Sequence, residues 1–250
     1  MNYKSQLMKN TAIIAIGNIG TKIVSFLLLR LYTSKLSTAE YGIYEFLVTL
    51  EVFLLPIITL LMEESMFRFL IDAETPKEKK RIVTATVFYT TLSGIIFTII
   101  TSIVMAIIHY QYAFLFIVFV ISNIFIGISN CLARGTGKIK LYAFSNFILG
   151  AATIILNILF IAVFNFGVVG LLLSNIIANM ATSIIMLIKM KLTKYISKKY
   201  ISRRVLSSMI RYSIPLVPNS ISWLIITMAD RIMLTTMVRR KRKWNIFCCQ

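Results

Sequence analysis

Seven apolar segments, each long enough to cross a lipid bilayer, follow one another along the chain and constrain its fold more than any other feature. A transmembrane helix needs about 20 mostly apolar residues. Because unpaired backbone polar groups are costly in lipid, such segments fold as helices. The roughly ten-residue alternation of a membrane β-barrel is absent. The sequence therefore predicts an all-α polytopic membrane protein. The predicted spans are 10–29, 41–62, 82–108, 111–131, 142–164, 167–188 and 209–237.

The composition excludes an ordinary soluble domain. Hydrophobic residues make up 58% of the 250 residues and charged residues 14%, whereas soluble domains have about 45–50% and about 25%. Intrinsic disorder is excluded because it needs low hydrophobicity. One His and three Cys cannot form a His/Cys zinc site, and the cysteines show no spacing typical of a disulfide framework. We expect neither a metal nor a cofactor.

Basic residues are concentrated in alternate connectors, which predicts the orientation of the chain. The N-terminal tail and the 63–81, 132–141 and 189–208 connectors hold seventeen Lys and Arg, against two in the opposite connectors. The positive-inside rule therefore places the N-terminus in the cytoplasm and predicts a multi-pass protein of the cytoplasmic membrane. This distribution explains most of the net charge of +18 without a nucleic-acid partner. An alternative role for the basic 189–204 segment is binding of anionic lipid head groups.

Polar side chains recur at helical spacing within five of the predicted spans. Examples are Asn157 in the fifth span and Asn175 and Asn179 in the sixth. Two interpretations remain open: the stripes line a shared polar interior, or they pack helices against one another. Glu63 and Glu64 lie at a span end, where long side chains extend to the interface, and we expect no cavity role for them.

Ionisable residues inside the spans are the stronger functional signal, because a charge at mid-bilayer costs about 2.5–3.5 kcal/mol on insertion scales. Such residues normally face a cavity or a partner. Glu51 is one of them and lies about 120° around the helix from Glu45, so we expect the two on different faces. Cationic Lys22 and Arg231 suit a substrate that carries phosphate. Glu45 and Asp230 suit charge balance or a coupling proton. A structural role for all four is the alternative.

Two local motifs, the prolines of the seventh span and the segment 134–138, are candidates for a functional role. Pro215 and Pro218 interrupt the seventh span, and a broken helix near polar groups is typical of transporters, although a kink used only for packing is the alternative. The segment 134–138 has a faint likeness to a phosphate-binding loop, but it lacks the first Gly and the Ser or Thr after the Lys. The single His109 has no second His for a catalytic triad. No catalytic constellation is present, so we expect a transporter rather than an enzyme.

Several short segments form a recognisable set. The most specific is Tyr212-Ser213-Ile214-Pro215-Leu216-Val217-Pro218. The others are Asn18 with Leu29-Arg30-Leu31, then 36–44, Phe67-Arg68-Phe69, 133–138, 157–159, 167–172 and Ala229-Asp230-Arg231. Together they resemble the N-terminal half of polysaccharide-biosynthesis flippases, the O-antigen or capsule repeat-unit exporters of the multidrug/oligosaccharidyl-lipid/polysaccharide (MOP) exporter superfamily. The resemblance covers residues 1 to about 238.

This resemblance implies two six-helix lobes around a central cavity that works by alternating access. It implies a substrate in which an oligosaccharide is carried on undecaprenyl diphosphate and moves to the outer leaflet, during polysaccharide biosynthesis. Implied partners are membrane lipids and a polysaccharide assembly machinery. The substrate-binding candidates are Lys22, Arg30, Asn18, Asn219 and Arg231, and the candidates for coupling or charge balance are Glu45 and Asp230.

The expected domains are a six-helix lobe at 1–204, the first helix of a second lobe at 205–238 and an aberrant basic tail at 239–250. Under the predicted topology this tail lies outside, against the positive-inside rule. If the reading frame of the gene is shifted by one base, the codons of the tail can encode an acidic stretch that ends Gly-Ile-Phe-Ser-Val-Ala. This stretch resembles the sequence that follows the seventh span in the flippase family. We therefore hypothesise that a frameshift truncates the chain; a natural tail is the alternative.

Three other functions remain as rivals. The first is a drug or small-cation exporter of the same superfamily, which would favour acidic cavity residues over Lys22 and Arg231. The second is a membrane-embedded glycosyltransferase or ligase, for which the outer connectors are too short. The third is an inactive fragment.

Overall fold

The computed structural model describes residues 32, 35–192, 195–196 and 200–226, and all regular structure within them is helical. The predicted all-α fold is therefore confirmed, and five described helices are long and apolar enough to cross a membrane. One of the five, Ile139–Val163, combines α6 with the π-helix η1, and the other described helical segments are α3, α8 and residues 216–226. The elements in chain order are α2 (Thr38–Thr59), α3 (Met62–Asp72), α4 (Pro76–Ile108), α5 (Ala113–Gly135), α6 (Ile139–Asn157), η1 (Ile158–Val163), α7 (Gly167–Met190) and α8 (Arg203–Ser213).

Local sequence explains where two of the helices begin. Ser37 caps α2 in a reciprocal pair with Glu40, and Thr75 caps α4 in the same way with Glu78. Such a capping box satisfies backbone N–H groups that have no partner inside the helix. Pro76 occupies the first turn of α4, where its missing N–H costs nothing.

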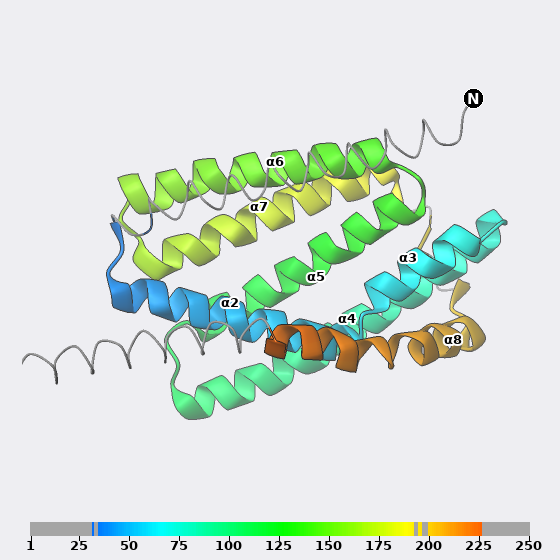
Figure 1. Cartoon of the computed structure of the whole chain (residues 1–250), viewed down its shortest axis with the longest axis horizontal. Coiled ribbons are helices and arrows are strands. Elements are labelled where there is room, and N and C mark those ends of the chain that lie inside the picture. The colour runs from blue at the N-terminus through cyan, green and yellow to red at the C-terminus, as the bar shows by residue number, and fades with distance from the viewer. Residues whose placement is uncertain (1–31, 33–34, 193–194, 197–199, 227–250) are drawn as a thin grey trace, which may run out of the picture.

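Helix α5 lies at the centre of the lobe and packs against α2, α3, α4, α6 and α7 (Figure 1). Its sequence is almost wholly apolar, and Phe116, Val120 and Leu132 are fully or nearly fully buried. By contrast, the outer faces of α4 and α6 expose large aliphatic and aromatic side chains such as Ile107 and Phe147. Apolar surface of this extent is stable only against lipid or a partner, which agrees with membrane-spanning helices.

The polar stripes of the fifth and sixth spans are mainly contacts between helices. The Ser174 hydroxyl donates to Asn157 Oδ1 at 2.8 Å, which joins α7 to α6. Asn175 Nδ2 donates to the Tyr44 hydroxyl on α2 at 3.2 Å, and Asn179 Nδ2 donates to Asn123 Oδ1 on α5 at 3.1 Å. Of the two interpretations left open by the sequence, helix packing therefore holds for these three residues. Such bonds are worth about 0.6–2 kcal/mol each in a membrane.

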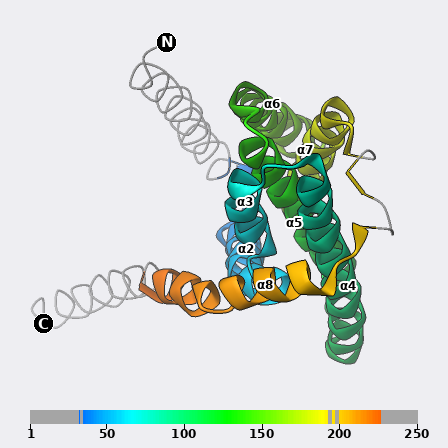
Figure 2. The same ribbon diagram turned by 90° about the vertical axis from the view of Figure 1, so that its right-hand side faces the viewer.

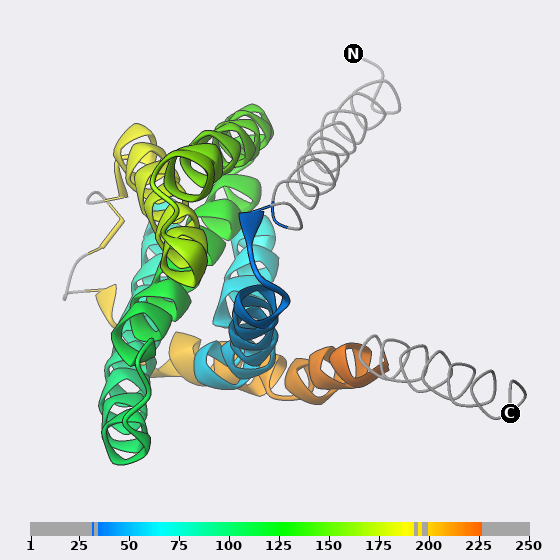
Figure 3. The ribbon, with the colours of Figure 1, turned by 90° about the vertical axis from the view of Figure 1, so that its left-hand side faces the viewer.

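The described part of the predicted seventh span, 209–226, is not one continuous helix. Residues 209–213 belong to α8, a turn follows at 214–215, and residues 216–226 are helical again. The break predicted at Pro215 is confirmed, because proline cannot donate the bond that would continue the helix. Helix α8 packs on α3 and α4, and the chain then runs past α2 to the opposite side of the lobe (Figures 2 and 3).

Candidate functional site

The predicted site residues are only partly within the described structure. Lys22, Arg30, Asn18, Asp230 and Arg231 lie outside the described residues, so their roles stay predictions. Glu45 is half-buried on α2 and accepts a hydrogen bond from the Tyr41 hydroxyl at 2.7 Å. Asn219 is exposed on the helix after the Pro215 turn. No hydrogen bond or ion pair in the described part of the chain joins Glu45 to Asn219.

Glu45 lies beside a cluster of three tyrosines near the start of α2 and is hydrogen-bonded to one of them. The rings of Tyr32, Tyr41 and Tyr44 lie with centroids 6.0–6.4 Å apart. The hydroxyl of Tyr44 accepts from Asn175 on α7, while that of Tyr41 donates to Glu45. Tyr32 follows Arg30, a predicted phosphate contact, by two residues. Aromatic faces, hydroxyls, an amide and a carboxylate therefore meet at one end of the α2–α7 interface.

A second carboxylate on α2 is buried in the middle of the span. Glu51 is 6% exposed and has no hydrogen bond to any described residue. Buried carboxylates without a partner are rare and mark functional sites in membrane helices. The sequence placed Glu51 inside a span and on a different face from Glu45, and the different burial of the two side chains agrees with that. Its burial was not predicted, because it depends on which face of α2 meets α4, α5 and α7.

The junction of α2 and α3 is a break that the sequence did not predict. Leu60 and Leu61 both have left-handed backbone conformations, with φ of 47° and 52°, which branched apolar residues rarely adopt. The Leu61 N–H donates to Thr59 Oγ1 at 3.2 Å, and the Leu61 carbonyl accepts from Ser213 Oγ of α8 at 3.5 Å. Pro56, one turn earlier, removes a backbone donor from α2. Side chains from α2 and α8 therefore hold an unfavourable backbone in place.

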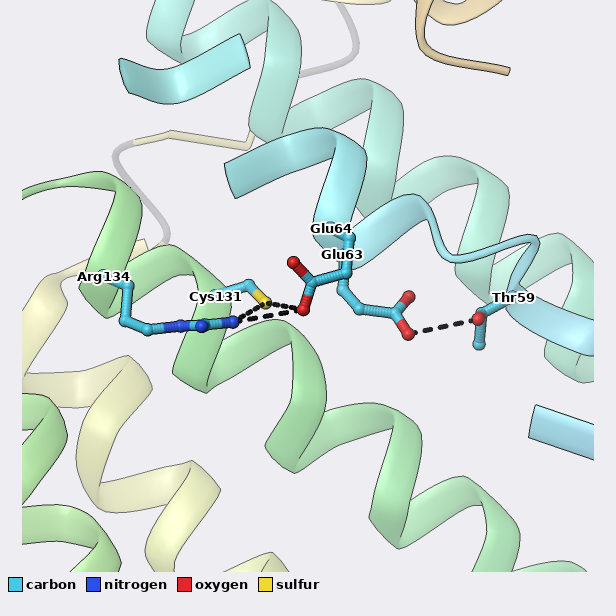
Figure 4. A network of polar contacts seen from close by, with 5 residues as sticks. All are labelled: Thr59, Glu63, Glu64, Cys131 and Arg134. Atoms are coloured by element: carbon cyan, nitrogen blue, oxygen red, sulfur yellow. Dashed lines mark hydrogen bonds and ion pairs between the residues drawn. The ribbon is translucent and has the colours of Figure 1, made fainter. Parts of the chain in front are cut away.

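Five residues around this break form a polar network on the side of the basic connectors (Figure 4). Arg134 Nη2 of α5 lies 3.2 Å from Glu64 Oε1 and 3.0 Å from Cys131 Sγ. Thr59 Oγ1 donates to Glu63 Oε1 at 3.3 Å. The carboxyl groups of Glu63 and Glu64 point to different sides (Figure 4). Of the two carboxylates, only that of Glu64 therefore forms an ion pair with Arg134.

Arg134 is held by aromatic rings as well as by Glu64. Its guanidinium lies 4.8 Å from the ring centroid of Phe67 on α3 and 5.6 Å from that of Tyr142 on α6. Cations over aromatic faces are stabilised by about 0.5–2 kcal/mol. One side chain therefore joins α5 to both α3 and α6. The segment 134–138 resembles a phosphate-binding loop, but its Arg134 is explained by these contacts between helices instead of by a nucleotide site.

The Glu63 residue is half-buried, and its carboxyl does not extend to the interface as its position at a span end predicts. Its Oε2 atom is buried and has no hydrogen bond among the described residues. Burial raises the pKa of the Glu63 carboxyl above its ordinary 4.5, and the neighbouring Glu64 adds to this effect. Position at a span end suggested solvent access, but packing of α3 against α5 and α8 removes it.

The raised pKa of Glu63 predicts a pH-dependent stability. Between 4.5 and the raised value the folded chain holds a proton that the unfolded chain has lost. Stability is therefore greatest below the ordinary pKa and falls as pH rises through the raised pKa. We expect Glu63→Gln to remove this decrease and to stabilise the chain at alkaline pH by about 1–3 kcal/mol, the usual cost of an unsatisfied buried group. Thermal unfolding in detergent micelles across a pH series measures both effects.

Glu64→Gln is the matched control. It removes the charge that pairs with Arg134, so it lowers stability, but it leaves the Glu63 carboxyl buried and removes only a smaller cause of its raised pKa. The decrease of stability with rising pH should persist in this variant. The same pH profile in Glu63→Gln and the natural chain would contradict the assignment.

The chain is similar to one protein family in sequence and to several solved structures in fold. A family model described as "Polysaccharide biosynthesis protein" matches residues 7–242. No curated protein sequence is significantly similar. The fold is similar to an outward-facing multidrug resistance MATE family transporter of the MOP superfamily (TM-score 0.64, 18% identity, 88% of this chain and 54% of that chain). It is also similar to a MATE crystallised in the straight conformation (TM-score 0.62, 16% identity, 92% of this chain and 54% of that chain).

These results confirm the predicted family and the MOP transporter fold. The chain spans about half the length of the transporters to which it is similar. The membrane-spanning helices agree with the family, and the predicted motifs lie within the matched region. Because the family model covers nearly the whole sequence, the chain belongs to the polysaccharide biosynthesis protein family.

Proposed function

We propose that the chain takes part in moving a lipid-linked oligosaccharide across the cytoplasmic membrane. The observation that carries this proposal is the family match over residues 7–242, together with the MOP transporter fold. The head group is an oligosaccharide on undecaprenyl diphosphate, and the polyprenyl tail stays in the lipid. Alternating access of two lobes exposes the head group first to the cytoplasm and then to the outer side.

The proposed chemistry divides the head group between two kinds of contact. Lys22, Arg30 and Arg231 bind the diphosphate through charge-assisted hydrogen bonds. Asn18 and Asn219 add neutral hydrogen bonds. The Tyr32–Tyr41–Tyr44 cluster lies two residues beyond Arg30 in sequence and offers the ring faces and hydroxyls that suit a sugar.

Charge balance or proton coupling is assigned to Glu45 and Asp230. Glu45 already accepts a bond from Tyr41, so a change in its protonation state would alter the tyrosine cluster. This links the charge of the acidic residue to the proposed sugar contacts.

Complementation tests the proposal. A bacterial strain that lacks its polysaccharide flippase receives the chain as printed, alone or with a separately expressed C-terminal lobe of a family member. We expect surface polysaccharide to reappear in at least one arrangement. Absence of polysaccharide in both, with the chain abundant in the membrane, would contradict the proposal.

Lys22→Ala and Arg231→Ala test the anion contacts in whichever arrangement is active. Each variant loses one charged hydrogen-bonding group, which is worth about 1.5–3 kcal/mol, so export should fall roughly tenfold or more with unchanged abundance. Lys140→Ala, an exposed lysine near the start of α6, is the control and should export normally. Normal export in both test variants would contradict the cavity assignment.

The two carboxylates of α2 that lie beyond its first turn support a second candidate, a drug or small-cation exporter. Glu51 is buried in the span and Glu45 is half-buried. Acidic side chains suit organic cations, whereas a diphosphate requires basic ones. Resistance of expressing cells to cationic drugs, lost in Glu45→Gln or Glu51→Gln, would favour this candidate over the flippase.

A further inference from the structure

A groove of about 320 Å³ runs along the outside of the lobe between α4 and α5. Gly94 and Thr98 line it from α4, while Ile121 and Phe125 line it from α5. A Cβ atom added at Gly94 would meet no atom within 4 Å. The absence of a side chain there therefore helps to open the groove, and the neighbouring helices do not close it.

The groove is suited to an apolar occupant. Apart from three threonines and Gly94, every side chain that lines it is aliphatic or aromatic. The hydroxyls of Thr90 and Thr98 are already bound to carbonyls of α4, at 2.8 Å each. These two hydroxyls therefore have little capacity to bind a polar ligand, whereas a hydrocarbon chain would fill the space.

The length of the groove matches one leaflet. On α4 it extends from Val87 to Ile99, which corresponds to about 18 Å at 1.5 Å per residue. Half of a hydrocarbon core of about 30 Å is about 15 Å. One acyl chain of a phospholipid fits this distance, whereas a polyprenyl chain is longer and would leave most of its length outside.

One end of the groove is basic. Leu187 and Leu192 line this end, and the exposed Lys191 lies between them in sequence. Lys80 lies two turns before Val87 and on the same face of α4, with its Nζ atom 5.4 Å from the ring centroid of Tyr200. The groove therefore starts at two lysines, at the level where lipid phosphates lie.

We propose that this groove binds one acyl chain of an anionic phospholipid from the leaflet on the basic side, with the lipid phosphate at Lys80 and Lys191. Helix α4, which lines the groove, lies on the opposite side of the lobe from the helix that follows α8 (Figure 2). A lipid bound there does not compete with the proposed substrate site on α2. The inference depends on the membrane fold alone and not on the proposed function.

Photo-crosslinking tests this binding site. The whole chain is placed in vesicles of phosphatidylethanolamine and phosphatidylglycerol that contain a trace of phosphatidylglycerol with a diazirine in the middle of one acyl chain. After irradiation, mass spectrometry locates the modified peptides. We expect adducts at 94–98 and 121–125, at least about fivefold more than with a phosphatidylcholine probe, since each of the two lysines favours anionic lipid by about that factor.

Gly94→Phe fills the groove and should abolish these adducts. Gly127→Phe is the control, because Gly127 on α5 also has open space but does not line the groove. Lys80→Gln with Lys191→Gln should remove the preference for phosphatidylglycerol, whereas Lys140→Gln should keep it. Circular dichroism and size exclusion verify folding, and Ile121→Trp serves as a second blocking variant on the opposite wall.

Three results would overturn the proposal. The first is labelling spread evenly over the exposed faces of α4 and α6. The second is unchanged labelling in the folded blocking variants. The third is stronger labelling at 94–98 by a polyprenyl phosphate probe than by phosphatidylglycerol.

Discussion

Replacing Arg134 by Ala is expected to lower the free energy of unfolding by about 2–3 kcal/mol. The partly buried ion pair with Glu64 contributes about 1 kcal/mol, and each ring contact, to Phe67 and to Tyr142, adds about 0.5–1 kcal/mol. The side chain joins α3, α5 and α6, so its loss loosens three helices at the basic end of the lobe. Titration with SDS in mixed micelles, followed by circular dichroism, measures the change.

Arg68→Ala is the matched control for this prediction. Arg68 also pairs with an acidic residue, Asp72, at 2.8 Å, but the two side chains are 53% and 59% exposed. An exposed pair one helical turn apart contributes about 0.3–0.5 kcal/mol. Arg134→Lys keeps the charge but loses the planar group that lies on the rings. The free energy of unfolding of this variant should therefore lie between those of Arg134→Ala and the natural chain. Equal losses in Arg134→Ala and Arg68→Ala would contradict the proposed role of the network.

Gly135→Val is expected to destabilise the lobe by about 1–3 kcal/mol, the usual cost of inserting atoms into a packed core. A Cβ atom at Gly135 would lie 2.9 Å from both Cβ and Cδ1 of Leu70 on α3. Leu70 is 1% exposed, so it has no space into which to move. The close approach of α5 to α3 therefore requires glycine at this position. Thermal unfolding in detergent measures the loss.

Two further variants separate the steric effect from helix propensity. Gly127→Val lies on the same helix with no atom within 4 Å of its added Cβ, so it should cost much less. Leu70→Ala in the Gly135→Val background should cost less than the sum of the single changes, because the clash with Cδ1 of Leu70 is removed and only the one with Cβ remains. Additive losses in the double variant would contradict the contact.

Much of the fold was predictable because each membrane segment satisfies its own backbone. The predicted spans 82–108 and 167–188 correspond to α4 (Pro76–Ile108) and α7 (Gly167–Met190), with longer ends in the structure. The break at Pro215 was predictable because it depends on one missing backbone donor. The break at Leu60–Leu61 was not, since no single residue there requires it and contacts from α8 help to hold it.

The candidate sites were less predictable, because charge can be counted along a sequence but burial cannot. Glu63 was expected to extend to the membrane interface, but its Oε2 atom is buried. Glu51 was recognised as intramembrane, but its burial depends on the packing face of α2. The lipid groove had no sequence signal, since its glycine and threonines resemble those of any membrane helix.

The sequence by itself determined that this is a helical membrane protein with basic connectors at one end. Apolar length and backbone hydrogen bonding are properties of each segment alone. Only the tertiary structure decided which faces meet, because that choice depends on shape complementarity between residues far apart in the chain. The contact between Gly135 and Leu70, the ring contacts of Arg134 and the open space at Gly94 all arise from that packing.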